Sequence, residues 1–318
     1  MNISVLGCGR WGSFIGWYLA NHGNNVYQWG REGATFDKLY KTRKNEYVSI
    51  DERITLTSNL EEAISHAEII VISISAQSLR DFMQSIVKFD VKDKIFVLCM
   101  KGIEVNTGKR LSEILIESGI DKNKIAVWVG PGHIQSFVSG QPNCMVIDGY
   151  NKDLIKYLAD SFRSELIRFY YGDDIIGSEI GAAAKNVIGI AAGMLDGGGY
   201  STLKGPLMAR GSREVARLIK ALGGNEFSAY GLCHLGDYET TLFSDFSNNR
   251  RFGFKYVKGE KFDKLAEGVT TAKALKTLGE KYNVDLPITN AICSIIYENK
   301  DPMSVFLSVF SRSTRKEF

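Results

Sequence analysis

The sequence predicts a chain with two domains: an α/β domain built on a doubly wound sheet, followed by an all-helical domain. Three observations predict this fold class. A glycine-rich turn joins the first strand to the first helix, apolar strand runs alternate with helical patterns up to about residue 172, and no convincing strand pattern follows Asp173. The chain has 318 residues, of which 44% are hydrophobic, so it is long enough for two cores. We therefore expect domains at 1–172 and 173–318.

The glycine-rich turn follows directly after the apolar run Ile3 to Leu6. It reads Gly7-x-Gly9-x-x-Gly12 and leads into an apolar helical pattern. In such a turn Gly7 makes the tight bend, Gly9 lets the backbone approach a pyrophosphate, and Gly12 lets the helix pack closely on the strand. The unpaired amides at the start of that helix favour an anion. The pattern predicts a Rossmann-like dinucleotide site, and its alternative is a purely structural turn.

The end of the second strand indicates which dinucleotide binds. The run Asn25 to Trp29 is followed by Gly30-Arg31-Glu32. An acidic side chain at this place would bind the ribose hydroxyls of NAD, whereas an arginine would pair with the 2′-phosphate of NADP. Arg31 comes first and favours NADP(H), while Glu32 keeps NAD(H) open. The structural alternative for Arg31 is an ordinary solvated loop residue.

The remaining elements follow from apolar periodicity. Continuous apolar runs predict strands at 69–74, 94–100, 125–129, 143–147 and 166–170, with helices at 59–66, 76–87, 107–118 and 151–163. The polar stretch 33–58 is expected to form a helix and loop on the surface. The second domain is expected to contain helices at 174–195, 206–221, 225–234, 262–281 and 287–298, and the charged tail from Arg312 to Phe318 is expected to be frayed.

Composition excludes several classes of function. The net charge of +3, from 39 basic and 36 acidic residues, is too balanced for a nucleic-acid partner. The apolar stretch 180–195 is interrupted by Lys185-Asn186 and is shorter than a membrane span, so we expect no membrane insertion. Five scattered cysteines and a strand that begins at residue 2, which leaves no room for a signal peptide, indicate a cytoplasmic protein with reduced thiols. The four histidines have no metal-ligand spacing, so no metal is expected.

Polar groups gather where the predicted strands end. Gly7 and Gly9, then Lys101, then Gly130 to His133 each follow a strand, and ligands bind at the carboxyl ends of strands in doubly wound sheets. In the helical domain, Lys185 lies in the small-residue run Gly177 to Gly193. A lysine in apolar surroundings is costly unless it is paired or functional, and its alternative is a side chain that extends to solvent.

Two further polar clusters occur in the helical domain. They are Ser201 to Lys204 with Arg210-Gly211, and Gly231 to Thr241 followed by Ser247 to Gly253. Singly, Asp237 is as well explained as a turn or cap residue, and Arg250-Arg251 as surface charge.

Together these motifs resemble the bacterial-type NAD(P)-dependent glycerol-3-phosphate dehydrogenase family over nearly the whole chain. The stretches that carry the resemblance are Gly7-Cys8-Gly9-Arg10-Trp11-Gly12, Lys101-Gly102, Gly130-Pro131, Gly181-Ala182-Ala183-Ala184-Lys185-Asn186-Val187-Ile188, Ala209-Arg210-Gly211, Leu235-Gly236-Asp237, Asn249-Arg250-Arg251-Phe252-Gly253 and Ala266-Glu267-Gly268-Val269-Thr270-Thr271-Ala272. Their order and spacing make the set specific. The resemblance implies hydride transfer between NAD(P)H and dihydroxyacetone phosphate, giving sn-glycerol 3-phosphate for phospholipid synthesis.

The resemblance also implies residue roles. Lys185 would be the general acid during reduction and the base in reverse, and Lys101 and Asp237 would hold and polarise the substrate. Substrate contacts are implied for Lys101, Gly130, Lys185, Asn186, Asp237, Thr241, Ser247 and Asn249. Cofactor contacts are implied for Gly7, Gly9, Arg10, Trp11, Gly12, Arg31, Lys101, Ile134, Arg250 and Glu267.

Two positions depart from the family pattern. Asn248 stands where the family has the arginine of a Ser-Arg-Asn triplet, so Arg250 or Lys204 would have to compensate at the substrate phosphate. Gly132 stands where the family has a serine, which removes one hydrogen bond, while His133 is read as a structural histidine.

These departures keep a second enzyme open, a relative that acts on a different phosphorylated or carboxylated 2-keto compound. A catalytically silent nucleotide sensor would be expected to lose Lys101, Lys185 or Asp237, and the chain keeps all three. The buried glycine-alanine helix around Lys185 and the many helical faces favour a homodimer.

Overall fold

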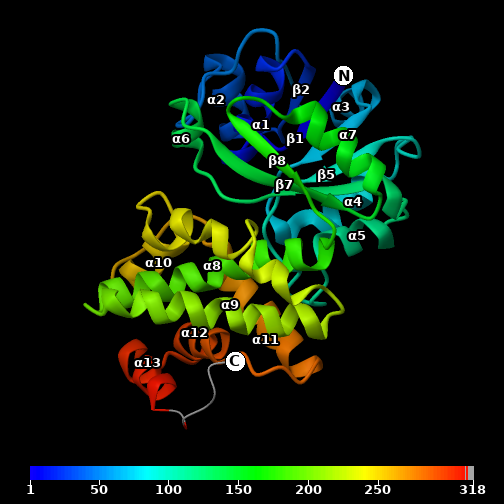
Figure 1. The fold of residues 1–318 in the computed structure, drawn as a ribbon. Coiled ribbons are helices and arrows are strands. Elements are labelled where there is room, and N and C mark those ends of the chain that lie inside the picture. The colour runs from blue at the N-terminus through cyan, green and yellow to red at the C-terminus, as the bar shows by residue number, and fades with distance from the viewer. Residues whose placement is uncertain (312, 314–318) are drawn as a thin grey trace. The chain divides into compact units, whose positions relative to one another are not determined.

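The computed structural model describes residues 1–311 and 313, so most of the tail expected to be frayed lies outside the described residues (Figure 1). The chain divides into two compact units. The first contains Met1–Lys101 and Lys109–Glu179, and the second contains Gly102–Gly108 and Ile180–Phe318. The division between the two compact units falls after Glu179. A boundary between folding domains at residue 172 stays a prediction.

The first unit is built on a sheet of eight strands. They are β1 (Asn2–Leu6), β2 (Asn25–Trp29), β3 (Thr55–Thr57), β4 (Ile69–Ile72), β5 (Ile95–Leu98), β6 (Ile125–Val129), β7 (Asn143–Gly149) and β8 (Ile167–Tyr171), in the order β3-β2-β1-β4-β5-β6-β7-β8. All neighbours are parallel except β6 and β7. The strand order reverses between β1 and β4, which is the switch point of a doubly wound sheet. The predicted fold class is confirmed.

Two features of the sheet differ from the sequence-based expectation. β7 runs antiparallel to β6, and the connection 130–142 between them contains the five-residue helix α6 (Ile134–Val138). The stretch 33–58 holds α2 (Ala34–Thr42) and also β3, with Val48, Ile50 and Ile54 buried. β3 has only three residues, two of them threonine, so it lacks the apolar run that revealed the other strands.

Helices cover both faces of the sheet (Figure 1). They are α1 (Arg10–Asn21), α2, α3 (Leu60–His66), α4 (Leu79–Ile86), α5 (Leu111–Glu117), α6 and α7 (Lys152–Phe162). Ile3 and Val5 of β1 belong to one core cluster with Phe14 of α1. Ser4, which points to the opposite face, donates its hydroxyl to the Ala63 carbonyl of α3 at 2.6 Å. Burial on both faces explains the continuous apolar runs.

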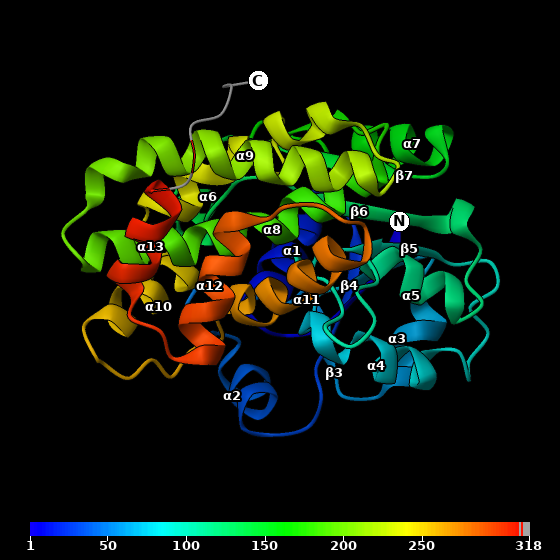
Figure 2. The same ribbon diagram turned by 90° about the horizontal axis from the view of Figure 1, so that it is seen from below.

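The described part of the second unit is helical. It contains α8 (Ile175–Gly197, from residue 180), α9 (Lys204–Ala221), α10 (Asn248–Val257), α11 (Glu267–Lys281), α12 (Pro287–Glu298) and α13 (Pro302–Phe310). Helix α12 packs on α11, and α13 packs on α12 (Figure 2). The predicted helix 225–234 is wrong: 3₁₀ segments at Glu226–Tyr230 and Leu235–Asp237 stand there. α10 was not predicted because its sequence is polar and only Gly253 is buried.

Small residues let α8 and α10 approach closely. A Cβ added to Gly193 of α8 would lie 1.9 Å from the Arg250 carbonyl, and one added to Gly253 of α10 would lie 2.1 Å from the Ile190 carbonyl. Within the part of the chain that the structure describes, α8 is the one helix long and apolar enough to be a candidate membrane span, but 94% of the residues in its most apolar stretch are buried inside the protein. α8 is therefore a core helix, and it carries Lys185 and Asn186.

Candidate active site

The carboxyl ends of β1, β2, β4, β5 and β6 share one edge of the sheet, because these strands are parallel. Two predicted substrate residues meet there: the Lys101 ammonium donates to the Gly130 carbonyl at 2.6 Å. The same ammonium lies 5.7 Å from the centre of the Trp11 ring. The edge therefore presents the Lys101 ammonium beside the start of α1, where an anionic ligand is favoured.

The turn before α1 fits a dinucleotide phosphate. Gly7 has φ +123°, and a Cβ on it would lie 2.1 Å from the Ser73 carbonyl, so only glycine fits. A Cβ on Gly12 would lie 1.9 Å from the Gly7 carbonyl, whereas one on Gly9 would meet no heavy atom within 4 Å. Gly9 thus faces open space at the N-cap of α1, which no side chain caps. A helix N-terminus that no side chain caps, with open space beside its N-cap glycine, suits a pyrophosphate.

Other predicted cofactor residues of this unit lie in different environments. The Arg10 guanidinium lies 5.3 Å from the centre of the Tyr47 ring and is 3.5 Å from the Gln135 amide oxygen. Ile134 is fully buried in the core. Arg31 is exposed, as is Glu32, whose carboxylate accepts from the Ser58 hydroxyl at 3.4 Å. Arg31 is accessible to a 2′-phosphate, and Glu32 remains beside it.

The backbone at Gly132 explains why no serine stands there. Gly132 has φ +148°, and a Cβ on it would lie 2.3 Å from Cε2 of Phe137. Phe137 is held in place, since it stacks on Phe14 with ring centres 5.1 Å apart. A serine at position 132 would therefore require both a strained backbone and movement of a buried ring.

In the helical unit, Lys185, Asp237 and Thr241 form one buried cluster. The Lys185 ammonium lies 2.7 Å from Oδ2 of Asp237 and donates to the Thr241 hydroxyl at 2.8 Å. Lys185 is 7% exposed and Asp237 is 0% exposed. The ion pair compensates both charges in surroundings where either alone would be costly. The buried lysine is paired, so the interpretation that it extends to solvent is excluded.

Short irregular helices hold this cluster together. Asp237 ends the 3₁₀ segment Leu235–Asp237, and its carboxylate also accepts from the Thr240 hydroxyl. Thr241 lies in a π-helix, Glu239–Phe243. Such π-helices are rare and occur frequently at functional sites.

A second group of predicted substrate residues meets at the start of α10 and α11. The Asn249 amide donates to the Asn186 side-chain oxygen at 2.9 Å, and the Gly268 amide donates to the Asn249 side-chain oxygen at 2.9 Å. Ser247 caps α10 by accepting from the Arg250 amide at 3.3 Å. Glu267, the predicted cofactor residue, begins α11 beside Gly268.

The two cations expected to compensate for Asn248 share a carboxylate partner. Asp196 of α8 lies 2.9 Å from the Lys204 ammonium and 2.8 Å from Nε of Arg250. Arg250 also pairs with Asp245 at 2.7 Å. Asn248 itself donates to the Leu265 carbonyl at 3.2 Å. Asp196 was not predicted, and no motif pointed to it.

A histidine and a tyrosine beside the Lys185 cluster were also missed. His234 and Tyr238 are both 0% exposed, and the Tyr238 hydroxyl lies 2.7 Å from Nε2 of His234. Burial lowers the pKa of His234 to about 4, so its imidazole is neutral near pH 7. The sequence feature that could have indicated the pair is that His234 and Tyr238 are four residues apart and flank Asp237.

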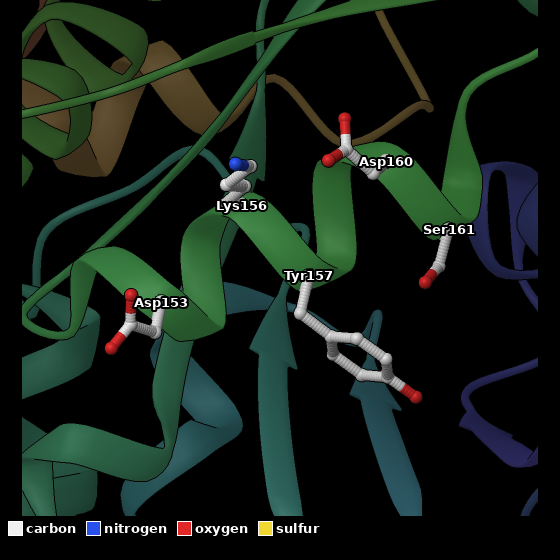
Figure 3. A pocket seen from close by; sticks show the side chains of 5 residues that line it. All are labelled: Asp153, Lys156, Tyr157, Asp160 and Ser161. Carbon is white, nitrogen blue, oxygen red and sulfur yellow. The ribbon is translucent and has the colours of Figure 1, made fainter.

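A hollow in the first unit has none of these residues in its lining. It is lined by Asp153, Lys156, Tyr157, Asp160 and Ser161, which all project from α7 (Figure 3). None of them is a predicted site residue, and all five come from a single helix.

Comparison with known proteins gives consistent matches along the chain. Residues 2–155 match the family model described as NAD-dependent glycerol-3-phosphate dehydrogenase N-terminus, and residues 174–306 match the model for the C-terminus of the same family. The NAD(P)+ glycerol-3-phosphate dehydrogenase of Prosthecochloris aestuarii is 34% identical over 331 residues, covering 100% of both chains. That of a Thermoanaerobacter species is 34% identical over 328 residues, covering 100% of this chain and 99% of the relative.

Solved structures share the fold. Glycerol-3-phosphate dehydrogenase from Coxiella burnetii superposes with a TM-score of 0.89 at 24% identity, covering 98% of each chain. A protein from Enterococcus faecalis described as the putative 2-dehydropantoate 2-reductase superposes with a TM-score of 0.58 at 15% identity. The match covers 96% of this chain and 99% of that one. At these identities the likeness concerns the fold alone.

Proposed function

The chain belongs to the NAD-dependent glycerol-3-phosphate dehydrogenase family, and from that premise we propose that it catalyses reversible hydride transfer between NAD(P)H and dihydroxyacetone phosphate. The reaction interconverts this ketone and sn-glycerol 3-phosphate, and its product feeds glycerophospholipid synthesis in the cytoplasm. The observation that carries the proposal is the buried cluster in which the Lys185 ammonium lies 2.7 Å from Asp237 and 2.8 Å from Thr241.

Lys185 is the proton donor of the proposed reaction. It gives a proton to the carbonyl oxygen during reduction and takes one from the hydroxyl during oxidation. When bound, the dinucleotide supplies the hydride from its nicotinamide. Asp237 keeps the Lys185 ammonium in one place and compensates its charge. The Thr241 hydroxyl accepts a second hydrogen bond from the ammonium and so fixes its orientation. Proton transfer from a fixed donor is what the ketone needs as its oxygen gains negative charge.

Lys101 holds and polarises the substrate in this proposal. Its ammonium is already oriented by the Gly130 carbonyl at 2.6 Å and by the Trp11 ring. A cation so placed stabilises negative charge on a bound ketone. Gly130 contributes through its backbone, so its role does not depend on a side chain.

The substrate phosphate is bound by Asn186, Thr241, Ser247 and Asn249. Asn186 and Asn249 are held by each other and by the Gly268 amide, which makes them preorganised polar groups. Amides and hydroxyls bind a phosphate less strongly than an arginine does. We therefore expect weaker phosphate binding here than an arginine at position 248 would provide.

The dinucleotide binds along the turn from Gly7 to Gly12, with its pyrophosphate at the start of α1. Arg10, Trp11, Lys101 and Ile134 belong to the proposed cofactor site in the first unit, and Arg250 and Glu267 to that in the second. Arg31 selects NADPH through the 2′-phosphate, while Glu32 keeps binding of NADH appreciable.

A second candidate function rests on Asn248 and Gly132. Lys204 and Arg250 pair with Asp196, so part of their charge is already compensated. This favours a relative that reduces a different phosphorylated or a carboxylated 2-keto compound. The homodimer stays a prediction with less support, because the glycine-alanine helix α8 is already covered within one chain. The five cysteines are free thiols, consistent with the proposed cytoplasmic location.

The deciding experiment follows nicotinamide absorbance with purified protein, dihydroxyacetone phosphate and either NADH or NADPH. Rapid oxidation with either dinucleotide supports the first proposal and identifies the preferred cofactor. No oxidation, from protein that still quenches its tryptophan fluorescence on dinucleotide binding, overturns it in favour of the second. A panel of phosphorylated and carboxylated 2-keto compounds then identifies the substrate.

A further inference from the structure

His234 and Tyr238 lie on either side of Asp237 in the sequence and contact each other in space. Their rings are 4.8 Å apart at an angle of 67°, and the Tyr238 hydroxyl is 2.7 Å from Nε2 of His234. Both side chains are completely buried. Neither residue is among the proposed substrate or cofactor contacts, so we place their effect on the reaction in Asp237, which lies between them in the sequence.

The hydrogen bonds of His234 to Gly181 and Tyr238 favour one tautomer, and the backbone of Gly211 is a further partner of the ring. Nδ1 lies 2.9 Å from the Gly181 carbonyl of α8, and a carbonyl oxygen only accepts. Nδ1 therefore carries the proton. Because the buried ring is neutral, Nε2 has a lone pair and accepts from the Tyr238 hydroxyl. In this tautomer the hydrogen-bonded chain runs from the Tyr238 hydroxyl through His234 to the Gly181 carbonyl.

Gly181 connects this chain to Lys185. In an α-helix the carbonyl of residue i accepts from the amide of residue i+4, so the Gly181 carbonyl belongs to the turn that carries Lys185. Asp237 is attached at the other end, since its amide donates to the His234 carbonyl at 3.0 Å and Tyr238 follows it directly. The two partners of the 2.7 Å ion pair are thus tied to one hydrogen-bonded chain.

Two glycines make room for the pair. A Cβ on Gly181 would lie 3.1 Å from Cβ of His234, and one on Gly211 of α9 would lie 3.0 Å from the Tyr238 hydroxyl. Both distances are tighter than ordinary contact, so the backbones of α8 and α9 enclose the pair closely. An enclosed side chain transmits its position to the residues beside it.

We propose that His234 and Tyr238 are positioning residues that hold the Asp237 carboxylate against the Lys185 ammonium. The inference rests on the proposed roles of Lys185 and Asp237. It goes beyond them by assigning the precision of that ion pair to the buried hydrogen bond between His234 and Tyr238, two residues outside the proposed substrate and cofactor contacts.

The first test compares Tyr238→Phe with Tyr18→Phe. Tyr18 is an equally buried tyrosine of the first unit, whose hydroxyl donates to the Phe162 carbonyl at 2.5 Å. We expect Tyr238→Phe to lower kcat about threefold to tenfold, the equivalent of one hydrogen bond, with KM for the dinucleotide unchanged. In ketone reduction the alkaline limb of its kcat profile moves to lower pH, because a looser ion pair gives up the proton more readily. Tyr18→Phe should change thermal stability only.

A double-variant cycle shows whether the two residues act as one unit. His234→Asn keeps a donor for the Gly181 carbonyl but is too short to accept from Tyr238. It should cost as much kcat as Tyr238→Phe, and combining the two should cost no more than either alone, since both remove the same bond. Losses that multiply, or an unchanged kcat and pH profile in both single variants, would overturn the proposal.

A readout without turnover keeps this inference separate from the proposed function. Nitrogen NMR of the imidazole in the ligand-free protein near pH 7 should show a neutral ring protonated at Nδ1. A ring protonated at Nε2, or doubly protonated, would refute the hydrogen-bond chain even in a fully active enzyme. Absence of activity toward dihydroxyacetone phosphate with the expected NMR signature would instead refute the proposed function alone.

Discussion

Replacing Lys185 by methionine separates its structural from its chemical contribution. Methionine is unbranched and apolar, so it fills the space of the lysine stem but leaves the Asp237 carboxylate, which is 0% exposed, without its ammonium 2.7 Å away. Breaking a buried ion pair by removing one partner costs about 3–5 kcal/mol of stability. Asp237→Asn in the same chain removes the uncompensated charge, and an asparagine oxygen can still accept from Thr240. The double variant should therefore recover most of the lost stability.

Turnover should respond differently from stability. Loss of a general acid lowers the rate by about 10²–10⁴-fold, or ~3–5 kcal/mol of barrier at 1.36 kcal/mol per decade. Neither Lys185→Met nor the double variant restores a proton donor, so both should remain inactive. Dinucleotide binding should stay close to that of the parent, because the glycine turn and α1 are unchanged.

The assay combines urea denaturation, initial rates of NAD(P)H oxidation and fluorescence titration with NADH on the same three proteins. Lys185→Met turning over within a few-fold of the parent rate would show that the proton comes from elsewhere. Recovery of turnover together with stability in the double variant would show that Lys185 acts only by balancing the charge of Asp237.

Three further predictions test other parts of the molecule. Arg31→Ala should weaken NADPH binding about tenfold or more and leave NADH nearly unchanged, because only NADPH carries the 2′-phosphate; equal losses in fluorescence titrations would exclude Arg31 as the discriminator. Gly132→Ser should destabilise the protein by about 2–4 kcal/mol in urea melts, since its Cβ meets Phe137 at 2.3 Å and its φ is +148°, and a stable variant would contradict the clash. Burial raises the pKa of Asp148 to about 6, so in the wild type this group's stabilisation is lost as pH rises from about 4 through 6. Asp148→Asn, whose side-chain oxygen can still accept from the Ser178 hydroxyl, should be more stable than the wild type by about 2 kcal/mol near pH 7 and equal to it near pH 4; equal stability at both pH values would contradict the shift.

Elements with strong periodic patterns were predictable. The runs at 69–74 and 125–129 form β4 and β6, and the helix expected at 174–195 is α8. Such runs are predictable because a continuous apolar run is buried most completely as a strand, and helically spaced apolar residues as a helix. β3 and α10 were missed for the opposite reason. Their residues are polar, and they form because neighbouring elements pair with or pack on them. Asp301-Pro302 is a helix-start signal that marks α13 and was overlooked.

The candidate site was predictable to the extent that residue types and spacings carry chemistry. Lys185 stood out as a charge in a small-residue helix, and Asp237 as part of a motif set, and the two do form an ion pair. Asp196 was not predictable, because its two cationic partners come from residues 204 and 250, and no local pattern links them.

Sequence alone thus specifies this protein's family, its α/β and helical architecture and the residue types available for hydride-transfer chemistry, since glycine spacing and apolar periodicity are local properties of the chain. Tertiary structure decides which of those residues are engaged. The pairing of Lys185 with Asp237, the sharing of Asp196 between two cations, and the bond between His234 and Tyr238 depend on distances across separate elements. Electrostatic and hydrogen-bond energies change steeply with such distances, and a linear pattern does not contain them.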